Sequence, residues 1–339
     1  QLKSALKPQI RILDIGTGPG SVPVGIMEYY KTLAESFPEL SFSLNFVLIE
    51  CEVDFLDIAK ELIERLREHL PDNLTVIIES TILEKVQAKS DFSSIGKFDL
   101  ITMSNFLTAN ENENENQENG AAIINRFKYN IKNDGALIVI EPGMKKSCIA
   151  LKRIRNEIIQ EGDFNIFSPC VGIWDEKNEY DCTCFNMVRC YWNVPKIYQF
   201  LIKKGLSKAD WGTVPFNYLV LRKDKLRKYS PIKNTQHFTR LTDLKEINGQ
   251  TVNIIALIRT VIYKGDNIAL SLCDGSCSFL PDDSNAIWVN VSQEQFEKEG
   301  INIPLISGEK ITLKKVNVKV KHNKINLQFG NDSRVAIDY

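Results

Sequence analysis

The sequence predicts an α/β fold with a parallel sheet, followed by a small all-β barrel. Three observations predict it. Short apolar runs alternate with amphipathic helical patterns over about the first 225 residues, and a glycine-rich turn at 14–20 follows the first run. Beyond residue 240 the pattern changes to short β-like runs separated by turns. Strands that alternate with helices form a parallel sheet, and ligands bind at the edge where its carboxyl ends meet.

The first part contains alternating strands and helices. Short apolar runs predict the strands, and apolar residues three and four apart predict the helices. The predicted strands are 11–15, 46–50, 74–78, 98–103, 136–140 and 218–221, and the predicted helices are 22–35, 53–70, 121–131, 147–160 and 194–204. The acidic segment 110–119 (NENENENQEN) cannot bury enough apolar surface to offset its ordering entropy, so we expect a loop there.

The last hundred residues predict a five-stranded barrel of the oligonucleotide-binding (OB) type. The predicted strands are 251–260, 267–272, 286–291, 310–320 and 324–329, with a helix at 293–299 between the third and the fourth. A β-domain with a purely structural role is the alternative. We therefore expect an α/β domain at 1–225 with a cysteine-rich segment at 168–192, a basic linker at 226–240 and a barrel domain at 241–339.

The formal net charge of −1 conceals two regions of opposite sign. Residues 1–120 carry 20 acidic and 10 basic residues, whereas the remainder carries 23 acidic and 32 basic residues. The basic part admits a polyanion such as nucleic acid as a partner, although a merely solvated basic surface would have the same composition.

The sequence gives no sign of a membrane or secreted protein. No apolar run approaches the ~20 residues that span a bilayer, and the N-terminus lacks a signal-peptide pattern, so we expect a cytoplasmic protein that binds no membrane. The first residue is Gln1 rather than Met, and we expect residues upstream of it.

The turn Asp14-Ile15-Gly16-Thr17-Gly18-Pro19-Gly20 is the clearest motif. Its glycines let the backbone approach a ligand closely, and Asp14 can accept a hydrogen bond from a cationic amino group or order the turn. The glycine spacing differs from the G-x-G-x-x-G of dinucleotide sites. The D-x-G-x-G-x-G pattern resembles the first motif of class I S-adenosylmethionine-dependent methyltransferases.

That resemblance implies that further residues contact the cofactor. Glu50 ends the second strand, where a carboxylate can accept both ribose hydroxyls, and Glu79 follows the third strand, where such enzymes contact the adenine. The end of the fourth strand, with Ser104 and Asn105, would face the methyl donor. We thus expect a cofactor site made by Asp14, Gly16, Thr17, Gly18, Gly20, Glu50, Glu79, Ser104 and Asn105.

No catalytic residue is assigned. The fourth strand lacks the Asn/Asp-Pro-Pro-aromatic signature of amino-group methyltransferases. Cys170 and Cys184 resemble the cysteine pair of cytosine-C5 RNA methyltransferases, but they follow the fifth strand, whereas the nucleophile of those enzymes follows the fourth.

The cysteines indicate a metal. Cys170, Cys182, Cys184 and Cys190 fall within 21 residues, and Cys273 is more distant. Because no export signal is present, clustered thiols favour a metal over disulfides, and thiolates suit either zinc or an iron–sulfur cluster. Scattered free cysteines are the alternative.

A wider resemblance covers about residues 10–225. The glycine turn, Gly135-Ala-Leu-Ile-Val-Ile-Glu-Pro-Gly143, Arg155, Ser168-Pro-Cys170, Cys184-Phe185 with Arg189, and Asn217-Tyr-Leu-Val-Leu221 together resemble the methyltransferase-like assembly factors of the small ribosomal subunit. That family is known from mitochondria, with bacterial and archaeal relatives. The segments 258–261 and 270–275 are similar to its C-terminal part more weakly.

The resemblance implies S-adenosylmethionine binding, a four-iron–four-sulfur cluster on four cysteines, and docking on small-subunit ribosomal RNA during ribosome assembly or translation. Cys170 matches the first cluster ligand and Cys273 the last. Position 176, where the family has its second cysteine, is Glu176, so two of Cys182, Cys184 and Cys190 must supply the middle ligands. The family fold admits an RNA methyltransferase, a non-catalytic assembly factor that uses the fold as a scaffold, and a zinc-dependent nucleic-acid-binding module.

Basic residues of two segments are the candidate RNA contacts. Within 311–321, apolar residues alternate with Lys315, Lys319 and Lys321, which predicts a strand with one cationic face, and Arg153 and Arg155 lie on the basic helix 147–160. Trp288, Phe279 or Tyr263 could stack bases beside that strand. Lysines on an exposed edge strand also prevent aggregation, which is the alternative role.

Overall fold

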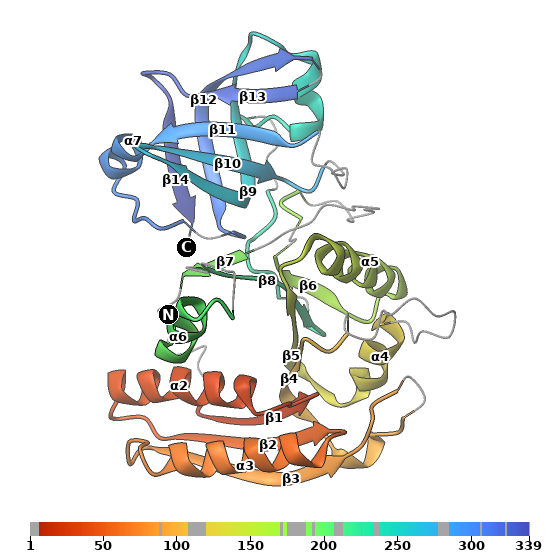
Figure 1. Cartoon of the computed structure of the whole chain (residues 1–339). Coiled ribbons are helices and arrows are strands. Elements are labelled where there is room, and N and C mark those ends of the chain that lie inside the picture. Colours follow the sequence, from red (N-terminus) through yellow and green to blue (C-terminus); the bar gives the residue numbers. More distant parts are fainter. Residues whose placement is uncertain are drawn as a thin grey trace. The chain divides into compact units, whose positions relative to one another are not determined.

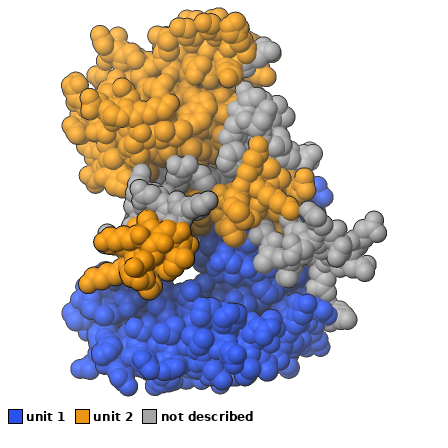
Figure 2. Space-filling model, viewed as in Figure 1, with its two compact units in different colours: residues 1–141, 157–167, 218–226 blue, residues 142–156, 168–217, 227–339 orange. Residues whose placement is uncertain are grey.

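The structure is a computed structural model of the chain. It describes residues 7–87, 90–107, 120–169, 172–174, 188–191, 194–206, 213–224, 226–232, 237–276, 285–305, 307–322 and 324–338. The chain forms two compact units (Figure 2). Unit 1 comprises residues 1–141, 157–167 and 218–226, and unit 2 comprises residues 142–156, 168–217 and 227–339.

The first part of the chain forms the predicted parallel sheet (Figure 1). Its strand order is β3-β2-β1-β4-β5-β8-β6, β7 pairs with β8, and the pairs among β1 to β5 are parallel. The strands are β1 (Gln9–Ile15), β2 (Phe42–Glu50), β3 (Leu74–Leu83), β4 (Phe98–Ser104), β5 (Ile131–Pro142), β6 (Asn165–Ser168), β7 (Val188–Tyr191) and β8 (Thr213–Arg222). The order 3-2-1-4-5 is that of Rossmann-like folds.

Five α-helices accompany these strands among the described residues. They are α2 (Ser21–Ser36), α3 (Val53–Arg67), α4 (Gly120–Arg126), α5 (Lys145–Glu161) and α6 (Lys196–Lys203), with short 3₁₀-helices at Ser93–Ile95 and Phe127–Tyr129. The apolar stripes of α2 and α3 pack on one face of β1, β2 and β3, where Met27, Phe46 and Ile63 are nearly solvent-free. This packing fixes the turn between β1 and α2 at the carboxyl edge of the sheet.

Several strands are longer than predicted, and the difference at β3 bears on the site. The prediction ended this strand at Ile78 because Glu79, Ser80 and Thr81 are polar, yet it continues to Leu83. Since β3 is the edge strand of the sheet, its outer residues remain solvated and polar side chains are tolerated there. The short strands β6 and β7 were not predicted because four-residue strands carry too little pattern.

The C-terminal part forms a closed barrel, as predicted. The strands β9 (Thr251–Lys264), β10 (Asn267–Cys273), β11 (Ile287–Ser292), β12 (Lys310–Lys321) and β13 (Lys324–Gln328) pair in the ring β9-β10-β11-β13-β12-β9, and β14 (Arg334–Asp338) adds to β12. The helix α7 (Gln293–Lys298) lies between β11 and β12 and begins with a capping box on Ser292 and Gln295. A 3₁₀-helix, Leu241–Glu246, precedes β9.

The barrel core consists of aliphatic side chains from alternate strand positions. In β12 the alternation breaks at Lys314 and Lys315, which are both exposed. There the pairing register of β12 with β9 shifts between Leu313 and Val316, and Lys315 has a φ of +54°. This β-bulge returns Val316 to the core.

Candidate functional site

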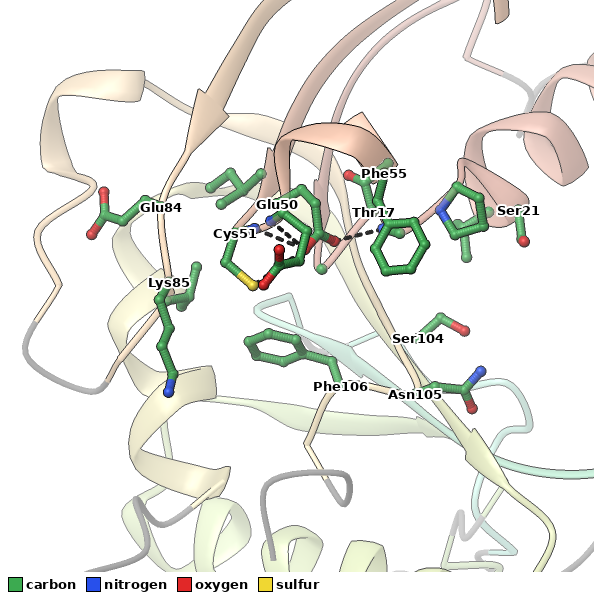
Figure 3. A pocket seen from close by; sticks show the side chains of 17 residues that line it. Thr17, Ser21, Glu50, Cys51, Phe55, Glu84, Lys85, Ser104, Asn105 and Phe106 are labelled. Atoms are coloured by element: carbon green, nitrogen blue, oxygen red, sulfur yellow. Dashed lines mark hydrogen bonds between the residues drawn. The ribbon is translucent and has the colours of Figure 1, made fainter. Parts of the chain in front are cut away.

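A pocket lies at the carboxyl ends of β1, β2 and β4, where the sequence places the cofactor (Figure 3). Its volume is about 420 Å³, which is within the range of small-molecule sites. It is lined by the turn after β1, by the end of β2 with the start of α3, by the segment after β3 and by the segment after β4. Thus Gly16, Thr17, Gly18, Glu50, Ser104 and Asn105, predicted from separate motifs, meet around one cavity.

The glycine turn brings bare backbone to the pocket. Gly16, Gly18 and Gly20 all have positive φ values, at +67°, +53° and +92°, which only glycine adopts without strain. The amide groups of Gly16 and Thr17 both donate to the carbonyl of Ile49, 2.9 and 3.0 Å away, which ties the turn to β2. A β-carbon on Gly16 would lie 2.6 Å from the ring of Phe106, whereas one on Gly18 would meet no atom within 4 Å. The space beside Gly18 is therefore open to a ligand.

The Glu50 carboxylate is held by backbone amides. Its Oε2 accepts from Gly18 N at 2.7 Å, and its Oε1 accepts from Cys51 N at 2.8 Å, Glu52 N at 3.2 Å and the Cys51 thiol at 3.3 Å. Burial alone would raise the pKa of Glu50, but these donors lower it overall. Glu50 is therefore ionised at neutral pH.

The expectation that Glu50 accepts two ribose hydroxyls stays a prediction, and the donors already present on its two carboxylate oxygens bear on it. Each carboxylate oxygen has about two lone-pair positions, and Oε1 already receives three donors. Oε2 receives only the amide of Gly18, so it retains one acceptor position. This arrangement accommodates one ligand hydroxyl on Glu50.

Asp14 lies beneath the turn and is almost solvent-free, with 1% of its surface exposed. Its Oδ1 accepts from the Thr102 hydroxyl at 2.6 Å, while its Oδ2 has no hydrogen-bond partner among the described residues. Burial, together with the nearby charge of Glu50, raises the pKa of Asp14 to about 6. Asp14 thus supports the glycine turn from below and keeps an unused acceptor.

The segment after β4 forms another wall of the pocket. Asn105 has a φ of +52°, and its amide donates to the carbonyl of Ile140 at 2.8 Å. The fully buried Glu141, at the end of β5, accepts from the amides of Phe106 and Leu107 at 3.1 and 2.8 Å. In Figure 3 the Phe106 ring points back toward Glu50 and Cys51. Glu141 was not predicted as a site residue, since only the packing of β4 against β5 reveals its role.

Glu79 does not line this pocket. Because β3 extends past it, Glu79 lies within the strand and forms an ion pair and two hydrogen bonds with Arg11. The acidic residue that follows β3 in the structure is Glu84, which lines the pocket with Lys85 (Figure 3). The end of β3 was misplaced by five residues, and Glu84 rather than Glu79 lies at the pocket.

The metal prediction falls largely outside the described residues. Cys170, Cys182 and Cys184 are not described, nor is the side chain of Cys190. Within the described part of the chain, no group of three or more His, Cys, Asp or Glu side chains could hold a metal ion. Cys273, at the end of β10, is partly exposed and not in a disulfide.

Next to Cys273, Asp274 is a fully buried centre of hydrogen bonds. Its Oδ2 accepts from the Trp174 indole and from Leu241 N, both at 2.9 Å. Its Oδ1 accepts from the amide and hydroxyl of Ser276 at 2.8 and 2.7 Å. The segment 172–174, which follows Cys170 in the sequence, is thereby attached to the residue after Cys273.

The predicted RNA-binding residues differ in accessibility. Lys315, Lys319, Lys321 and Arg153 are exposed, whereas Arg155 is only 2% exposed and donates to Asn156. The apolar face of α5 carries Arg155 inward, so the assignment of Arg155 to an RNA surface is not supported by its position. Phe279 is not described, and the hydroxyl of Tyr263 accepts from Leu305 N beside the barrel core, which leaves Trp288 on the outer surface.

The comparison with protein families decides the class of the first part. The model of a methyltransferase domain matches residues 6–205, more than half of the chain. The chain belongs to this methyltransferase domain family. The predicted class I methyltransferase fold with its parallel sheet is therefore confirmed, and the matched residues include the glycine turn.

Solved structures give distant matches to this methyltransferase domain protein. A class I S-adenosylmethionine-dependent methyltransferase described from Listeria monocytogenes is 11% identical over 67% of this chain and 57% of that chain, with a TM-score of 0.36. A methyltransferase from Methanosarcina mazei is 12% identical over 66% and 96% of the two chains, with a TM-score of 0.37. The HIN1 domain of p202, solved with a 12-mer double-stranded DNA, is 16% identical over 35% and 57%, with a TM-score of 0.24.

These structural similarities are too distant to add to the family assignment, and the chain spans 57% of the Listeria protein. No curated protein matches the sequence. Among the described residues, no helix has the length and hydropathy needed to span a membrane.

Proposed function

We propose that this methyltransferase domain protein binds S-adenosylmethionine in the pocket at the carboxyl edge of the sheet and transfers its methyl group to RNA. The observation that carries the proposal is the meeting of the glycine turn with the Glu50 carboxylate, whose orientation is set by three backbone amides before any ligand arrives. A carboxylate so held is preorganised, because a ligand hydroxyl needs no rearrangement of it.

The residues present fit this cofactor. The open space above Gly18 admits ligand atoms against the backbone, and α2 begins at Gly20 with no side-chain cap, so its first amides face the turn. Asp14 and Glu50 place two carboxylates near a ligand that carries an ammonium and a sulfonium group. The unpaired Asp14 Oδ2 is a buried acceptor that the fold leaves unused.

When bound, S-adenosylmethionine supplies an electrophilic methyl group. The described residues around the pocket then bind and orient, and the β4 side offers Ser104 and Asn105 rather than a titratable base. The Cys51 thiol is no candidate nucleophile, because burial and its hydrogen bond to Glu50 raise its pKa. Catalysis would rest on proximity and alignment.

For the substrate we propose small-subunit ribosomal RNA. The support is the resemblance of residues 10–225 to methyltransferase-like assembly factors of the small ribosomal subunit, together with a closed barrel of five strands and the excess of basic over acidic residues, 32 to 23, in 121–339. Small barrels of this kind bind oligonucleotides on their surface.

The test is a transfer assay with methyl-labelled S-adenosylmethionine on small-subunit ribosomal RNA. Label in the RNA from the wild-type chain, and none from Gly16→Ala, supports the enzyme. Binding of the cofactor without any transfer removes the enzyme and leaves the cofactor site.

A second candidate is a non-catalytic assembly factor that uses the same pocket and fold as a scaffold. It is favoured by the lack of a titratable group on the β4 side of the pocket among the described residues, where Phe106 instead packs against Gly16. In the transfer assay this candidate predicts cofactor binding, RNA binding and no labelled product.

We also propose a four-iron–four-sulfur cluster on Cys170, Cys273 and two of Cys182, Cys184 and Cys190, with zinc as the alternative metal. Its support is the set of thiols and the attachment of the 172–174 segment to Asp274, which brings chain that follows Cys170 beside Cys273. Elemental analysis and an absorption spectrum decide between the metals. Iron with a visible charge-transfer band supports the cluster, zinc in a colourless protein replaces it, and the absence of both metals overturns the site.

A further inference from the structure

The outer surface of the barrel has one face that the chain itself covers. Ile255, Leu257 and Ser271 point away from the barrel core on β9 and β10, yet they are only 9%, 4% and 0% exposed. Ile173, Tyr229, Ile232 and Phe238, from the segments before the barrel, pack on Ile255 and Leu257. This covered face is therefore not available to a partner.

The face formed by β11, β13 and β12 is uncovered. We define the open barrel face by Trp288, Asn290, Lys319, Lys321, Lys324 and Asn326. The indole of Trp288 is half-buried and the other five side chains are exposed. The strands lie side by side in the ring (Figure 1), and their register aligns Lys319 with Asn326 and Asn326 with Trp288. Lysines, amides and an indole thus share one surface.

The polar groups of the open barrel face are unused. None of its six side chains forms a hydrogen bond or ion pair with any other residue in the described ranges. By contrast, Lys298, also near the barrel surface, pairs with Glu294 at 2.7 Å. The open barrel face therefore presents three unneutralised positive charges.

Lys321 and Lys324 oppose each other directly across the β12–β13 ladder. Like charges at such a position destabilise a sheet. At this end of the hairpin the described residues place no further strand beside them, because the pairing of β12 with β9 ends at Asn317 and that of β13 with β11 begins at Asn326, but edge protection does not require two lysines to face each other. The repulsion between the two lysines is unfavourable for folding, and no contact among the described residues compensates for it. Unfavourable local arrangements of this kind are expected at functional sites. An anion between the two ammonium groups turns the repulsion into attraction.

We propose that the open barrel face binds single-stranded RNA, with a phosphate at Lys321 and Lys324 and a base stacked on Trp288. Cationic side chains beside an aromatic ring are the means by which barrels bind single strands, and the amides of Asn290 and Asn326 can pair with base edges. Stacking and base pairing of this kind need unstacked bases, which excludes a duplex. The choice of RNA rests on the proposed function, whereas the position of the site does not.

The test uses the full chain and a fluorescently labelled 12-nucleotide single-stranded RNA, with binding followed by anisotropy over a range of salt. We expect Trp288→Leu to weaken binding by roughly 5- to 150-fold, the range of one lost base stack. Lys321→Gln with Lys324→Gln should lower the slope of log affinity against log salt by about 0.7 for each phosphate that the protein no longer neutralises. The matched control is Lys264→Gln, which removes another exposed lysine without a partner among the described residues and should bind nearly as the wild type does.

Thermal unfolding separates binding from structure. Because the two lysines repel each other, Lys321→Gln should leave the melting temperature unchanged or raise it while RNA affinity falls. Wild-type affinity in all open-face variants, or a loss of affinity only in proportion to a lower melting temperature, would overturn the proposal. Equal competition by duplex RNA or by polyglutamate would do so as well, and equal binding of single-stranded DNA would overturn the choice of RNA.

Titration of the same variants with S-adenosylmethionine keeps this proposal distinct from the proposed function. Unchanged cofactor affinity with lost RNA affinity supports the open barrel face. Unchanged affinity for both ligands overturns the face and leaves the cofactor pocket intact. A wild-type chain that binds RNA through these residues but no cofactor overturns the proposed function alone.

Discussion

Two buried aspartates show how differently the same side chain is used in the two units. Asp274 beside the barrel has both carboxylate oxygens filled, by donors from Trp174, Leu241 and Ser276. Asp14 beneath the pocket is equally buried, but while its Oδ1 accepts from the Thr102 hydroxyl, its Oδ2 lacks a hydrogen-bond partner among the described residues. An isolated buried charge is costly, so an unfilled acceptor needs an explanation outside the fold.

From this difference we infer that Asp274 is structural and that Asp14, which lies beneath the glycine turn rather than on the pocket wall, serves the ligand. Asp274 joins segments distant in sequence, whereas Asp14 lies under a turn that leaves room for a ligand. Substitution should therefore affect stability at Asp274 and ligand affinity at Asp14. The following experiments test whether the two aspartates differ in this way.

The largest effect is expected for Asp274→Asn. The NH₂ group of the new side chain would face hydrogen-bond donors, and the charge-assisted hydrogen bonds from Trp174 and Leu241 would be lost or weakened. We therefore expect a loss of about 3 kcal/mol in the free energy of unfolding. Urea denaturation measures it, with Asp266→Asn, an exposed aspartate of the β9–β10 hairpin, as the control. Cofactor affinity of the folded variant should be unchanged, and a stability within about 0.5 kcal/mol of wild type, the effect of an ordinary surface change, would contradict the structural role.

Gly16→Ala comes next. Its positive φ and the Phe106 ring 2.6 Å from the added β-carbon together predict a loss of about 2–4 kcal/mol, and the displaced turn should no longer bind the cofactor. Gly162→Ala is the matched control, because Gly162 has a φ of +79° but open space around its β-carbon position. The excess of the Gly16 effect over the Gly162 effect, measured by denaturation, isolates the clash with Phe106. Equal losses would show that the Phe106 ring contributes nothing.

Glu50→Gln tests the carboxylate that the backbone already orients. The substituted side chain would keep one acceptor oxygen but direct an NH₂ group at backbone donors, so we expect about 1–3 kcal/mol less stability and at least tenfold weaker cofactor binding. Glu84→Gln, also at the pocket but exposed, should change both quantities less. Because the pKa of Glu50 is lowered by folding, its stabilisation is present above the pKa of the unfolded chain and is lost as pH falls through the folded value.

The effect of Asp14→Asn on stability should depend on pH. Burial raises the pKa of Asp14 to about 6, so the folded state holds a proton that the unfolded chain releases near pH 4. Its contribution to the free energy of unfolding is therefore full below pH 4 and declines by roughly 3 kcal/mol as pH rises through 6. Denaturation between pH 4 and 7 should show this decline in the wild type and not in Asp14→Asn.

The same variant should bind the cationic cofactor about tenfold more weakly at pH 7. In the wild type, affinity should rise between pH 5 and 7 as Asp14 ionises. A pH-independent wild-type affinity would show that Asp14 only orders the turn.

The sequence predicted the parts of this site that depend on local pattern. The glycine turn, Glu50 at the end of β2 and Ser104–Asn105 after β4 were found because a strand end is marked by the change from apolar to polar residues. Glu79 was misassigned for the same reason, since an edge strand stays polar beyond its apparent end. Glu141 and Asp274 act through contacts distant in sequence, and no local pattern indicates such contacts. The strand β14 was missed because its five residues carry little alternation.

The central claim is that the pocket beneath the glycine turn holds S-adenosylmethionine. Calorimetric titration of the wild-type chain with S-adenosylmethionine at pH 7, in parallel with Gly16→Ala and Gly162→Ala, tests it most directly. We expect one saturable site for S-adenosylmethionine in the wild type and in Gly162→Ala, and none in folded Gly16→Ala. A wild-type chain that releases no heat and shows no stabilisation by the cofactor would contradict it.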